Sequence, residues 1–202
     1  MTEKHPCHAC ANPILASTAI RTGGLCMPCK GGYRENIEHG KQRATERKQY
    51  LASPQAQYWS ALVNRVYHTE QGFAGLALAE QHYYAVNCLS GEVYNGGFEQ
   101  YFGNSSADHY LIACAGLRTL GALHTLALLE EARGVLFGAH PVPLDQGERQ
   151  LRMPTYAPAG DADCEAALDT LDARFYLDSE ALDDRLRKHA RVHGLFEHLE
   201  PS

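Results

Sequence analysis

Four cysteines near the start of the sequence have the spacing of a metal site. Cys7 and Cys10 form one pair with two residues between them, and Cys26 and Cys29 form a second pair, separated from the first by fifteen residues. A two-residue spacing lets both sulfurs of a pair reach one ion, and two such pairs complete a tetrahedral S₄ site of the kind that holds Zn²⁺. All four positions are then filled by the protein. We therefore expect a structural zinc with no open position for catalysis.

A redox role is the main alternative for the cysteine pairs, because a Cys-x-x-Cys motif also occurs in thiol oxidoreductases. Such motifs sit at a helix start within a strand–helix–strand pattern, which is not visible around these residues. His5 and His8 could each replace a cysteine ligand, but four thiols are already available. The pattern favours zinc bound by the cysteines alone, with both histidines outside the coordination shell.

The first 33 residues are predicted to fold as a zinc ribbon. Between the cysteine pairs, Ile14–Leu15 can pair with Thr18–Ile20 as a short hairpin, and Gly23–Gly24 permits a tight turn into the second pair. A module of about thirty residues buries too little apolar surface to fold alone. We therefore expect the folding of residues 1–33 to depend on the metal.

Residues 34–52 are predicted to form a basic helical linker, interrupted near Gly40. Two interpretations of this linker are open. It is either a solvated connector between ribbon and body, or part of a nucleic-acid contact over residues 30–48 whose affinity falls steeply with salt. Three glutamates dilute the charge and favour the connector. The positive charge of the linker comes mainly from Lys41, Arg43, Arg47 and Lys48.

The two parts of the chain carry opposite charge. Its 202 residues have a net charge of -6, but residues 1–48 hold eight basic and four acidic side chains, and the remainder holds ten basic and twenty acidic ones. No apolar run is long enough to cross a bilayer and no signal peptide is apparent. We therefore expect a cytoplasmic protein with reduced thiols and no membrane partner.

Residues 53–202 are predicted to form an all-helical body of about six to eight helices. Ser53–Pro54 is typical of a helix start, and Tyr58, Leu62 and Val66 then recur at the intervals of a core-facing helix. Similar apolar stripes continue toward the C-terminus, and no useful length after residue 33 alternates with period two. The predicted fold class is mostly α, with a small N-terminal zinc ribbon that contains a β-hairpin.

The segment Gly91–Ser105 is unlike an ordinary helix, because it combines paired glycines with aromatic residues. A glycine costs about 1 kcal/mol relative to alanine inside a helix. The pair therefore predicts a sharp junction that needs a positive φ or a close backbone approach. Asn95 can cap the helix that starts there, and Phe98 and Phe102 lie on one face of that helix.

The motif in this segment resembles that of a known family. The pattern is Asn-Gly-Gly-Phe-x-Gln-Tyr-Phe-x-Asn-Ser, and together with the alanine-rich helix beyond residue 121 it is similar to the bacterial DNA-mimic protein 19-like domain of unknown function. The resemblance covers roughly residues 54 to 199 and implies an all-helical fold. The family's namesake resembles DNA electrostatically and binds a bacterial transcription factor, keeping it from its operator. The motif residues that we single out are Asn95, Gly96, Gly97, Phe98, Gln100, Phe102 and Asn104.

A band of acidic residues in the last two predicted helices is the candidate binding face. Carboxylates spaced along helices could imitate a row of phosphates and steer a basic partner. Such a partner is a transcription factor, or a nuclease toxin that an immunity protein neutralises. The alternative is a solvated helix surface whose acids complement helix dipoles. The band consists of Asp161, Asp163, Glu165, Asp169, Asp172, Asp178, Glu180, Asp183 and Asp184.

An enzymatic role has weaker support. Polar side chains of the motif region could line a cleft beside two tyrosines, with Glu92 as a general base. No metalloprotease, nucleophile-elbow, phosphate-loop or dinucleotide motif accompanies them. We therefore expect a non-enzymatic protein, either of the DNA-mimic or immunity type or a nucleic-acid-binding regulator, which could also form a homodimer. The cleft residues would be Tyr94, Asn95, Glu99, Gln100, Tyr101 and Asn104.

Overall fold

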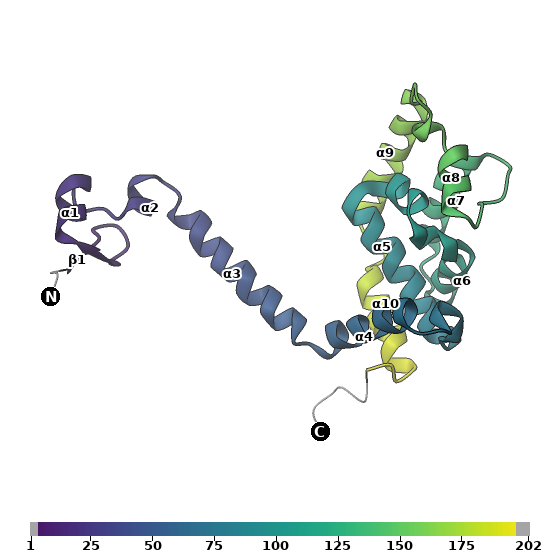
Figure 1. The fold of residues 1–202 in the computed structure, drawn as a ribbon, viewed down its shortest axis with the longest axis horizontal. Coiled ribbons are helices and arrows are strands. Elements are labelled where there is room, and N and C mark those ends of the chain that lie inside the picture. The colour runs from purple at the N-terminus through teal and green to yellow at the C-terminus, as the bar shows by residue number, and fades with distance from the viewer. Residues whose placement is uncertain (1–3, 197–202) are drawn as a thin grey trace. The chain divides into compact units, whose positions relative to one another are not determined.

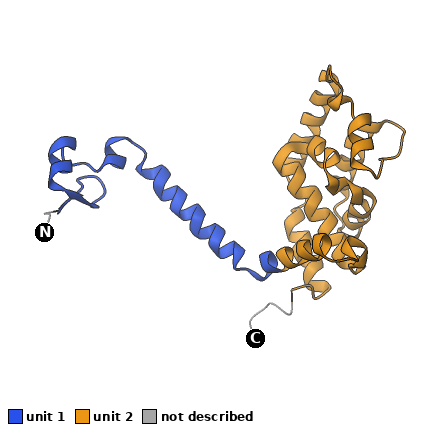
Figure 2. Cartoon of the chain, in the orientation of Figure 1, with its two compact units in different colours: residues 1–57 blue, residues 58–202 orange. Residues whose placement is uncertain are grey.

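The structure is a computed structural model that describes residues 4–196 of the chain (Figure 1). The chain forms two compact units, residues 1–57 and residues 58–202 (Figure 2). Each unit has its own cluster of buried hydrophobic residues. The cluster of the first unit has three buried members, whereas that of the second extends through the helical body. The second unit therefore has the larger hydrophobic core.

The first unit begins with a two-stranded antiparallel sheet. Strand β1 (Lys4–Pro6) pairs with strand β2 (Pro13–Leu15). The connection between the two strands contains Cys7 and Cys10. The sheet therefore positions the first cysteine pair.

The segment that follows the sheet is a helix. Helix α1 (Ala16–Thr22) contains Thr18–Ile20, so the predicted pairing of these residues with Ile14–Leu15 is wrong. Two alanines favour the helical conformation here. Gly23 then ends the helix in the left-handed region at φ 69°, which is a common helix stop. The sequence predicts a tight turn at Gly23–Gly24, and in the structure Gly23 is the C-cap of α1.

Two further helices complete the first unit. Helix α2 (Met27–Lys30) is a single turn, and helix α3 (Arg34–Leu51) is an unbroken helix of 18 residues. The predicted interruption near Gly40 is therefore wrong. One glycine costs about 1 kcal/mol, which good helix formers around it and side-chain pairs such as Gln42 with Glu46 (2.8 Å) help to offset.

Helices make up the second unit within the described residues, as predicted. Ser53 Oγ accepts a hydrogen bond from the N–H of Ala56 (3.2 Å), which confirms the predicted helix start at Pro54. The seven α-helices from α4 to α10 agree with the expected six to eight. Between residues 4 and 196, no helix combines the length and the apolar composition that a bilayer crossing requires. The elements, with η for 3₁₀ helices, are α4 (Pro54–His68), η1 (Gly72–Gly75), α5 (Leu78–Gly103), η2 (Ser105–His109), α6 (Tyr110–Leu120), α7 (Leu123–Phe137), α8 (Gln146–Arg152), η3 (Pro154–Tyr156), α9 (Ala162–Tyr176) and α10 (Leu182–Val192).

Helix α5 is the central element of the second unit (Figure 1). It packs against α6, α8, α9 and α10, and its side chains Leu89, Val93 and Phe98 are completely buried. Helix α7 packs against α6 and α9. Helix α5 carries the sequence motif and α9 carries much of the acidic band. The packing of α5 on α9 therefore brings the two candidate regions together.

A buried arginine on α8 closes the C-terminal end of α5. Arg149 is completely buried, and its guanidinium donates to the carbonyl oxygens of Phe102 (2.9 Å) and Asn104 (2.7 Å) and to Asp108 Oδ1 (2.6 Å). It also donates to the carbonyl oxygens of residues 143 and 144. The last carbonyls of a helix have no partner within the helix, so Arg149 satisfies groups that the end of α5 leaves open.

Candidate functional site

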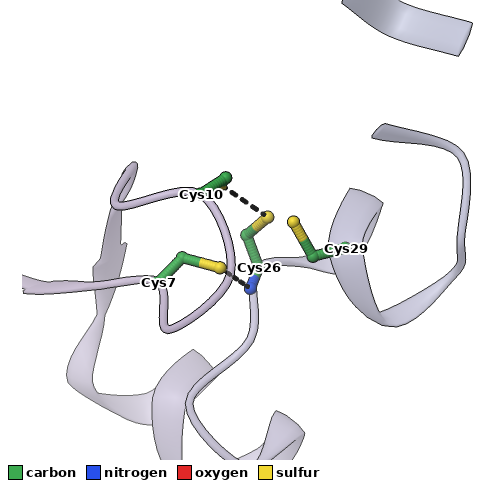
Figure 3. A group of neighbouring side chains, drawn as sticks. All are labelled: Cys7, Cys10, Cys26 and Cys29. Atoms are coloured by element: carbon green, nitrogen blue, oxygen red, sulfur yellow. Dashed lines mark hydrogen bonds between the residues drawn. The ribbon is translucent and has the colours of Figure 1, made fainter. Parts of the chain in front are cut away.

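The four predicted ligand cysteines come together in the first unit (Figure 3). Cys7 and Cys10 lie between β1 and β2, Cys26 precedes α2 and Cys29 lies within it. Their Sγ atoms all lie within 4.8 Å of one another, and the Sγ atoms of Cys10 and Cys26 are 3.7 Å apart. A tetrahedron with metal–sulfur bonds of about 2.3 Å has edges of about 3.8 Å. The cluster could therefore hold one metal ion.

Hydrogen bonds from the protein orient the sulfurs. The backbone N–H of Cys26 donates to Cys7 Sγ (3.2 Å), as Figure 3 shows. The guanidinium of Arg34, at the start of α3, donates to Cys26 Sγ (3.0 Å). Partners of this kind fix ligand orientation in metal sites, and the arginine offsets part of the negative charge that thiolates bring.

Hydrogen bonds within the cluster give the thiols different pKa values. The hydrogen bond from the backbone of Cys26 is the main cause that lowers the pKa of Cys7 to about 6. The hydrogen bond with the Cys26 side chain is the main cause that raises the pKa of Cys29 to about 12. The protein thus stabilises some thiolates but not all four together. A divalent cation supplies the missing positive charge, so the donor set fits a metal ion.

The histidines of this unit occupy other positions. His8 packs its imidazole against Gly24, which has φ 82°, and any side chain at Gly24 would overlap the ring. His5 lies in β1. Within the described residues, the group that could hold a metal ion consists of the four cysteines. Gly24 is thus required for the close approach between the two cysteine-bearing segments.

Helix α5 is kinked at the paired glycines of the motif. Gly96 and Gly97 have non-helical dihedral angles, and Gly97 adopts φ 76°, the positive value that the sequence predicts. The N–H of Phe98 donates to Asp172 Oδ1 on α9 (2.9 Å), and any side chain at Gly97 would overlap that carboxylate. Asp172 therefore accepts the capping hydrogen bond that the sequence assigned to Asn95, which is exposed.

The polar residues of the motif converge on Glu92. Its carboxylate accepts hydrogen bonds from Gln100 Nε2 (2.6 Å), Asn104 Nδ2 (2.9 Å) and Ser106 Oγ (2.9 Å). Glu92 precedes the kink, Gln100 follows it within α5, and Asn104 and Ser106 lie just beyond the helix, so these bonds join the first half of α5 to its second half and to the start of η2. Tyr101, which was expected to border a polar cleft, is completely buried. This arrangement explains Glu92 and its partners as a support for the kink.

The other motif residues lie where helix geometry predicts. Phe98 and Phe102 are completely buried in the core of the second unit. Glu99, the residue after Phe98, is half-buried. The motif therefore contributes both to the core and to the packing of α5 on α9, where Phe98 meets Phe175 (ring centroids 5.6 Å apart).

Most of the predicted acidic band has structural partners within the protein. Asp161 accepts a backbone hydrogen bond at the N-terminus of α9, Asp178 does so at α10, and Glu180 does so at α7. Asp183 and Asp184 both form ion pairs with an arginine of their own helix. For these five residues, helix capping and local pairing account for the acidic side chain. The band is thus not a single row.

A protein-family model matches the central part of the chain. The model describes DMP19-like proteins, and it matches residues 74–193. The chain belongs to this family. The match confirms the resemblance carried by the motif and includes α5 to α10, whereas the four-cysteine cluster lies outside it. No curated protein and no solved structure matches the chain.

One face of α9 in the DMP19-like domain carries a shorter acidic row. Asp161, Glu165, Asp169 and Asp172 follow one another at intervals of four, four and three residues, which places them on one side of the helix. Burial is the main cause that raises the pKa of Asp172, and the charges of Asp169 and Glu99 add to the shift. Glu99 of α5 therefore lies beside the row. These four residues and Glu99 are called the acidic row below.

Two stacked tyrosines lie next to the acidic row of the DMP19-like domain. The rings of Tyr94 and Tyr176 are 5.8 Å apart with an interplanar angle of 22°, and both side chains are about half exposed. Burial raises the pKa of Tyr176, and the charges of Asp172 and Asp169 add to the shift. Aromatic rings beside carboxylates suit arginine side chains, which bind both groups. The sequence indicates Tyr94 as a cleft residue but gives no sign of its partner Tyr176.

Replacing Gly97 with alanine is expected to destabilise the DMP19-like domain by about 2–3 kcal/mol. About 1–2 kcal/mol comes from the positive φ, and about 1 kcal/mol from displacing the Asp172 cap. Urea unfolding followed by circular dichroism measures the change. The matched control is Gly91→Ala, because a side chain there meets nothing within 4 Å. That change should stabilise α5 by up to about 1 kcal/mol. Equal unfolding free energies for the two variants would contradict the proposed role of Gly97.

Proposed function

We propose that this protein is a non-enzymatic binding protein whose DMP19-like domain engages a basic, nucleic-acid-binding protein through the acidic row. The observation that carries the proposal is the alignment of unpaired carboxylates on one face of α9. Among the described residues, no lysine or arginine forms an ion pair with any member of the row. Unpaired charges of one sign produce a field that steers a partner of opposite charge.

The dimensions of the row limit what it can imitate. Residues four apart on a helix are separated by about 6 Å along the axis, so the four α9 carboxylates span roughly 16 Å. One strand of DNA carries a phosphate for about every 3.4 Å of axis, which is nearly twice that density. The row would therefore replace a short stretch of phosphates. Asp161 and Asp172 are held by backbone N–H groups, which lowers the ordering cost of binding.

The chemistry of the row favours an arginine-rich partner. Proteins that bind DNA contact phosphates chiefly with arginine and lysine. Such a surface would meet the carboxylates of the row and the exposed faces of Tyr94 and Tyr176. A bacterial transcription factor and a nuclease toxin both present surfaces of this kind. Binding to the DMP19-like domain would keep either protein from its nucleic acid.

The first unit, in this proposal, holds a structural Zn²⁺ ion. The four thiols suit zinc or iron, and zinc accepts the closed tetrahedral arrangement without a preferred electronic geometry. A closed S₄ site has no position for a substrate. Zinc would therefore stabilise the fold of this unit rather than take part in a reaction.

Neutralising the acidic row is expected to abolish capture of a basic partner. The protein is immobilised, exposed to a bacterial lysate in low salt, and eluted with salt for mass spectrometry. The captured protein is then tested for DNA binding by gel shift, with and without added DMP19-like protein. Asp161 and Asp172 are left unchanged because they cap helices. The row variant is E99Q/E165Q/D169N, and the control variant with the same charge change outside α9 is E70Q/E130Q/E148Q.

The control variant should capture the same basic proteins as the wild type, and the row variant should capture none of them. The wild type should also displace a captured DNA-binding protein from its DNA. Retention of the same partners by the row variant would contradict the proposal. So would partners that remain bound at high salt, because an electrostatic contact weakens as salt screens it.

A further inference from the structure

Helix α3 is largely exposed. It runs from Arg34 to Leu51, and none of its residues is buried. A side chain added at Gly40 would meet nothing within 4 Å. Because the helix is unbroken at this glycine, residues on both sides of it keep one angular register of about 100° per residue. The distribution of charge around the whole helix can therefore be compared.

This register separates the charges of α3 onto opposite faces. Glu35, Glu38 and Glu46 fall within an arc of roughly 80° around the helix axis. The centre of the basic side chains lies on the opposite side, roughly 180° away. The glutamates dilute the positive charge in the linear sequence, but on the helix they lie away from the centre of the basic face, and Glu38 pairs with Lys41 at its edge. The basic side chains of this face are Lys41, Arg43, Arg47 and Lys48.

The basic face has two rows, and the middle of the strip between them carries small residues. Lys41 and Lys48 are seven residues apart, and Arg43 and Arg47 are four apart, so each pair lies along the helix axis. The two rows are separated by roughly 130° around the helix. The strip between the rows carries Gly40 and Ala44 at its centre, with Ile37 and Leu51 toward the two ends of the helix.

We propose that this face of α3 binds the phosphate backbone of duplex DNA, with the helix lying in the major groove. A helix is about 10–12 Å wide, and the major groove is about 12 Å wide. Cations on both flanks of the helix would meet phosphates of the two strands that border the groove. Gly40 and Ala44 allow the helix backbone to approach the base edges closely. Lys41 forms an exposed ion pair with Glu38 (3.1 Å). An exposed ion pair contributes little free energy, so it does not prevent Lys41 from binding a phosphate.

The proposal fixes the salt dependence and the preferred nucleic acid. Four cations on phosphates give a slope of about -3 to -4 in a plot of log affinity against log salt concentration. Duplex RNA has a deep, narrow major groove that does not admit a helix. Duplex DNA should therefore bind more tightly than duplex RNA of the same sequence. Binding depends on α3 alone, so it is independent of the acidic row.

Fluorescence anisotropy of the full-length, zinc-loaded protein with a labelled DNA duplex of about 20 base pairs tests the proposal. The α3 variant should bind at least roughly tenfold more weakly than the wild type, with a salt slope close to zero. The control variant, which loses the same charge in the second unit, should stay within about twofold of the wild type. Glutamine is a good helix former, and circular dichroism checks that α3 persists. The α3 variant is K41Q/R43Q/R47Q/K48Q, and the control is R152Q/R187Q/K188Q/R191Q.

Several results of this experiment would overturn the proposal or a part of it. Absence of salt-sensitive binding by the wild type, or equal binding by wild type and α3 variant, would overturn the proposal. Equal affinity for duplex RNA and duplex DNA would overturn the placement in the major groove. Competition by an acidic protein without any DNA binding would assign the face to a protein partner instead. The row variant should bind DNA as the wild type does, which separates this test from that of the acidic row.

Discussion

Chelation of the metal is expected to unfold residues 4–33 and to leave the DMP19-like domain folded. The buried cluster of the first unit consists of Cys7, Ile14 and Cys26, so two of its three members are themselves predicted ligands. Apolar burial on that scale does not offset the conformational entropy of about thirty residues. Structural zinc contributes about 10–16 kcal/mol of apparent binding free energy in small modules. This is the largest effect that we expect in the protein.

Hydrogen exchange with and without a chelator measures this effect directly. Amides of β1, β2 and α1 should lose protection, whereas those of α5 should keep it. The matched variants are Cys26→Ser, which removes a ligand, and Cys88→Ser, which changes a thiol of α5 outside the cluster. Only the first should unfold the N-terminal unit. Unchanged protection of β1 after elemental analysis shows complete metal loss would refute metal-dependent folding.

Features that depend on local spacing could be predicted from the sequence. Two cysteine pairs indicate one metal site because each pair needs only a single turn of chain to aim both sulfurs. The paired glycines indicate a kink because a positive φ is a property of a single residue, and Gly97 adopts it at 76°. The helices of the second unit follow from apolar periodicity in the same way. In each case the signal and its structural consequence lie within a few residues.

Features that depend on distant partners could not be predicted. Asp172 accepts the N–H of Phe98 across 74 residues, and Glu180 accepts that of Thr125 across 55. A carboxylate that caps a distant helix looks the same in sequence as one that faces solvent. The acidic band was therefore predicted as one surface, although several of its members serve helix ends. Similarly, the three residues of β1 have no strand signal, since one of them is Pro6.

Arg149 is the clearest case of a residue whose role comes from groups that are distant in the sequence. Replacing Arg149 with methionine is expected to destabilise the DMP19-like domain by about 3–5 kcal/mol. The buried guanidinium donates five hydrogen bonds, four to carbonyl oxygens and one to Asp108. Methionine has similar length but no donor. Each buried acceptor left without a partner costs about 1–3 kcal/mol, and a domain has only about 5–15 kcal/mol in total.

Urea unfolding of Arg149→Met against Arg118→Met measures this loss. Arg118 pairs with Glu130 at an exposed position (2.9 Å), so its replacement should cost less than about 1 kcal/mol. Lysine at position 149 keeps the charge but not the fork of five donors, so it should recover only part of the stability. A domain with methionine at position 149 that is as stable as the wild type would show that the carbonyls find other partners.

The contributions of Arg149 and Glu92 to the free energy of unfolding are expected to be coupled, because both side chains form a hydrogen bond with Asn104. The carbonyl of Asn104 accepts from Arg149 (2.7 Å), while its side-chain amide donates to Glu92 (2.9 Å). One residue thus takes part in both networks. Residues that share a partner have non-additive effects on the free energy of unfolding, by about 0.5–3 kcal/mol. The double variant R149M/E92Q should therefore lose less stability than the sum of its single variants. Strict additivity would mean that the end of α5 and its kink are held independently.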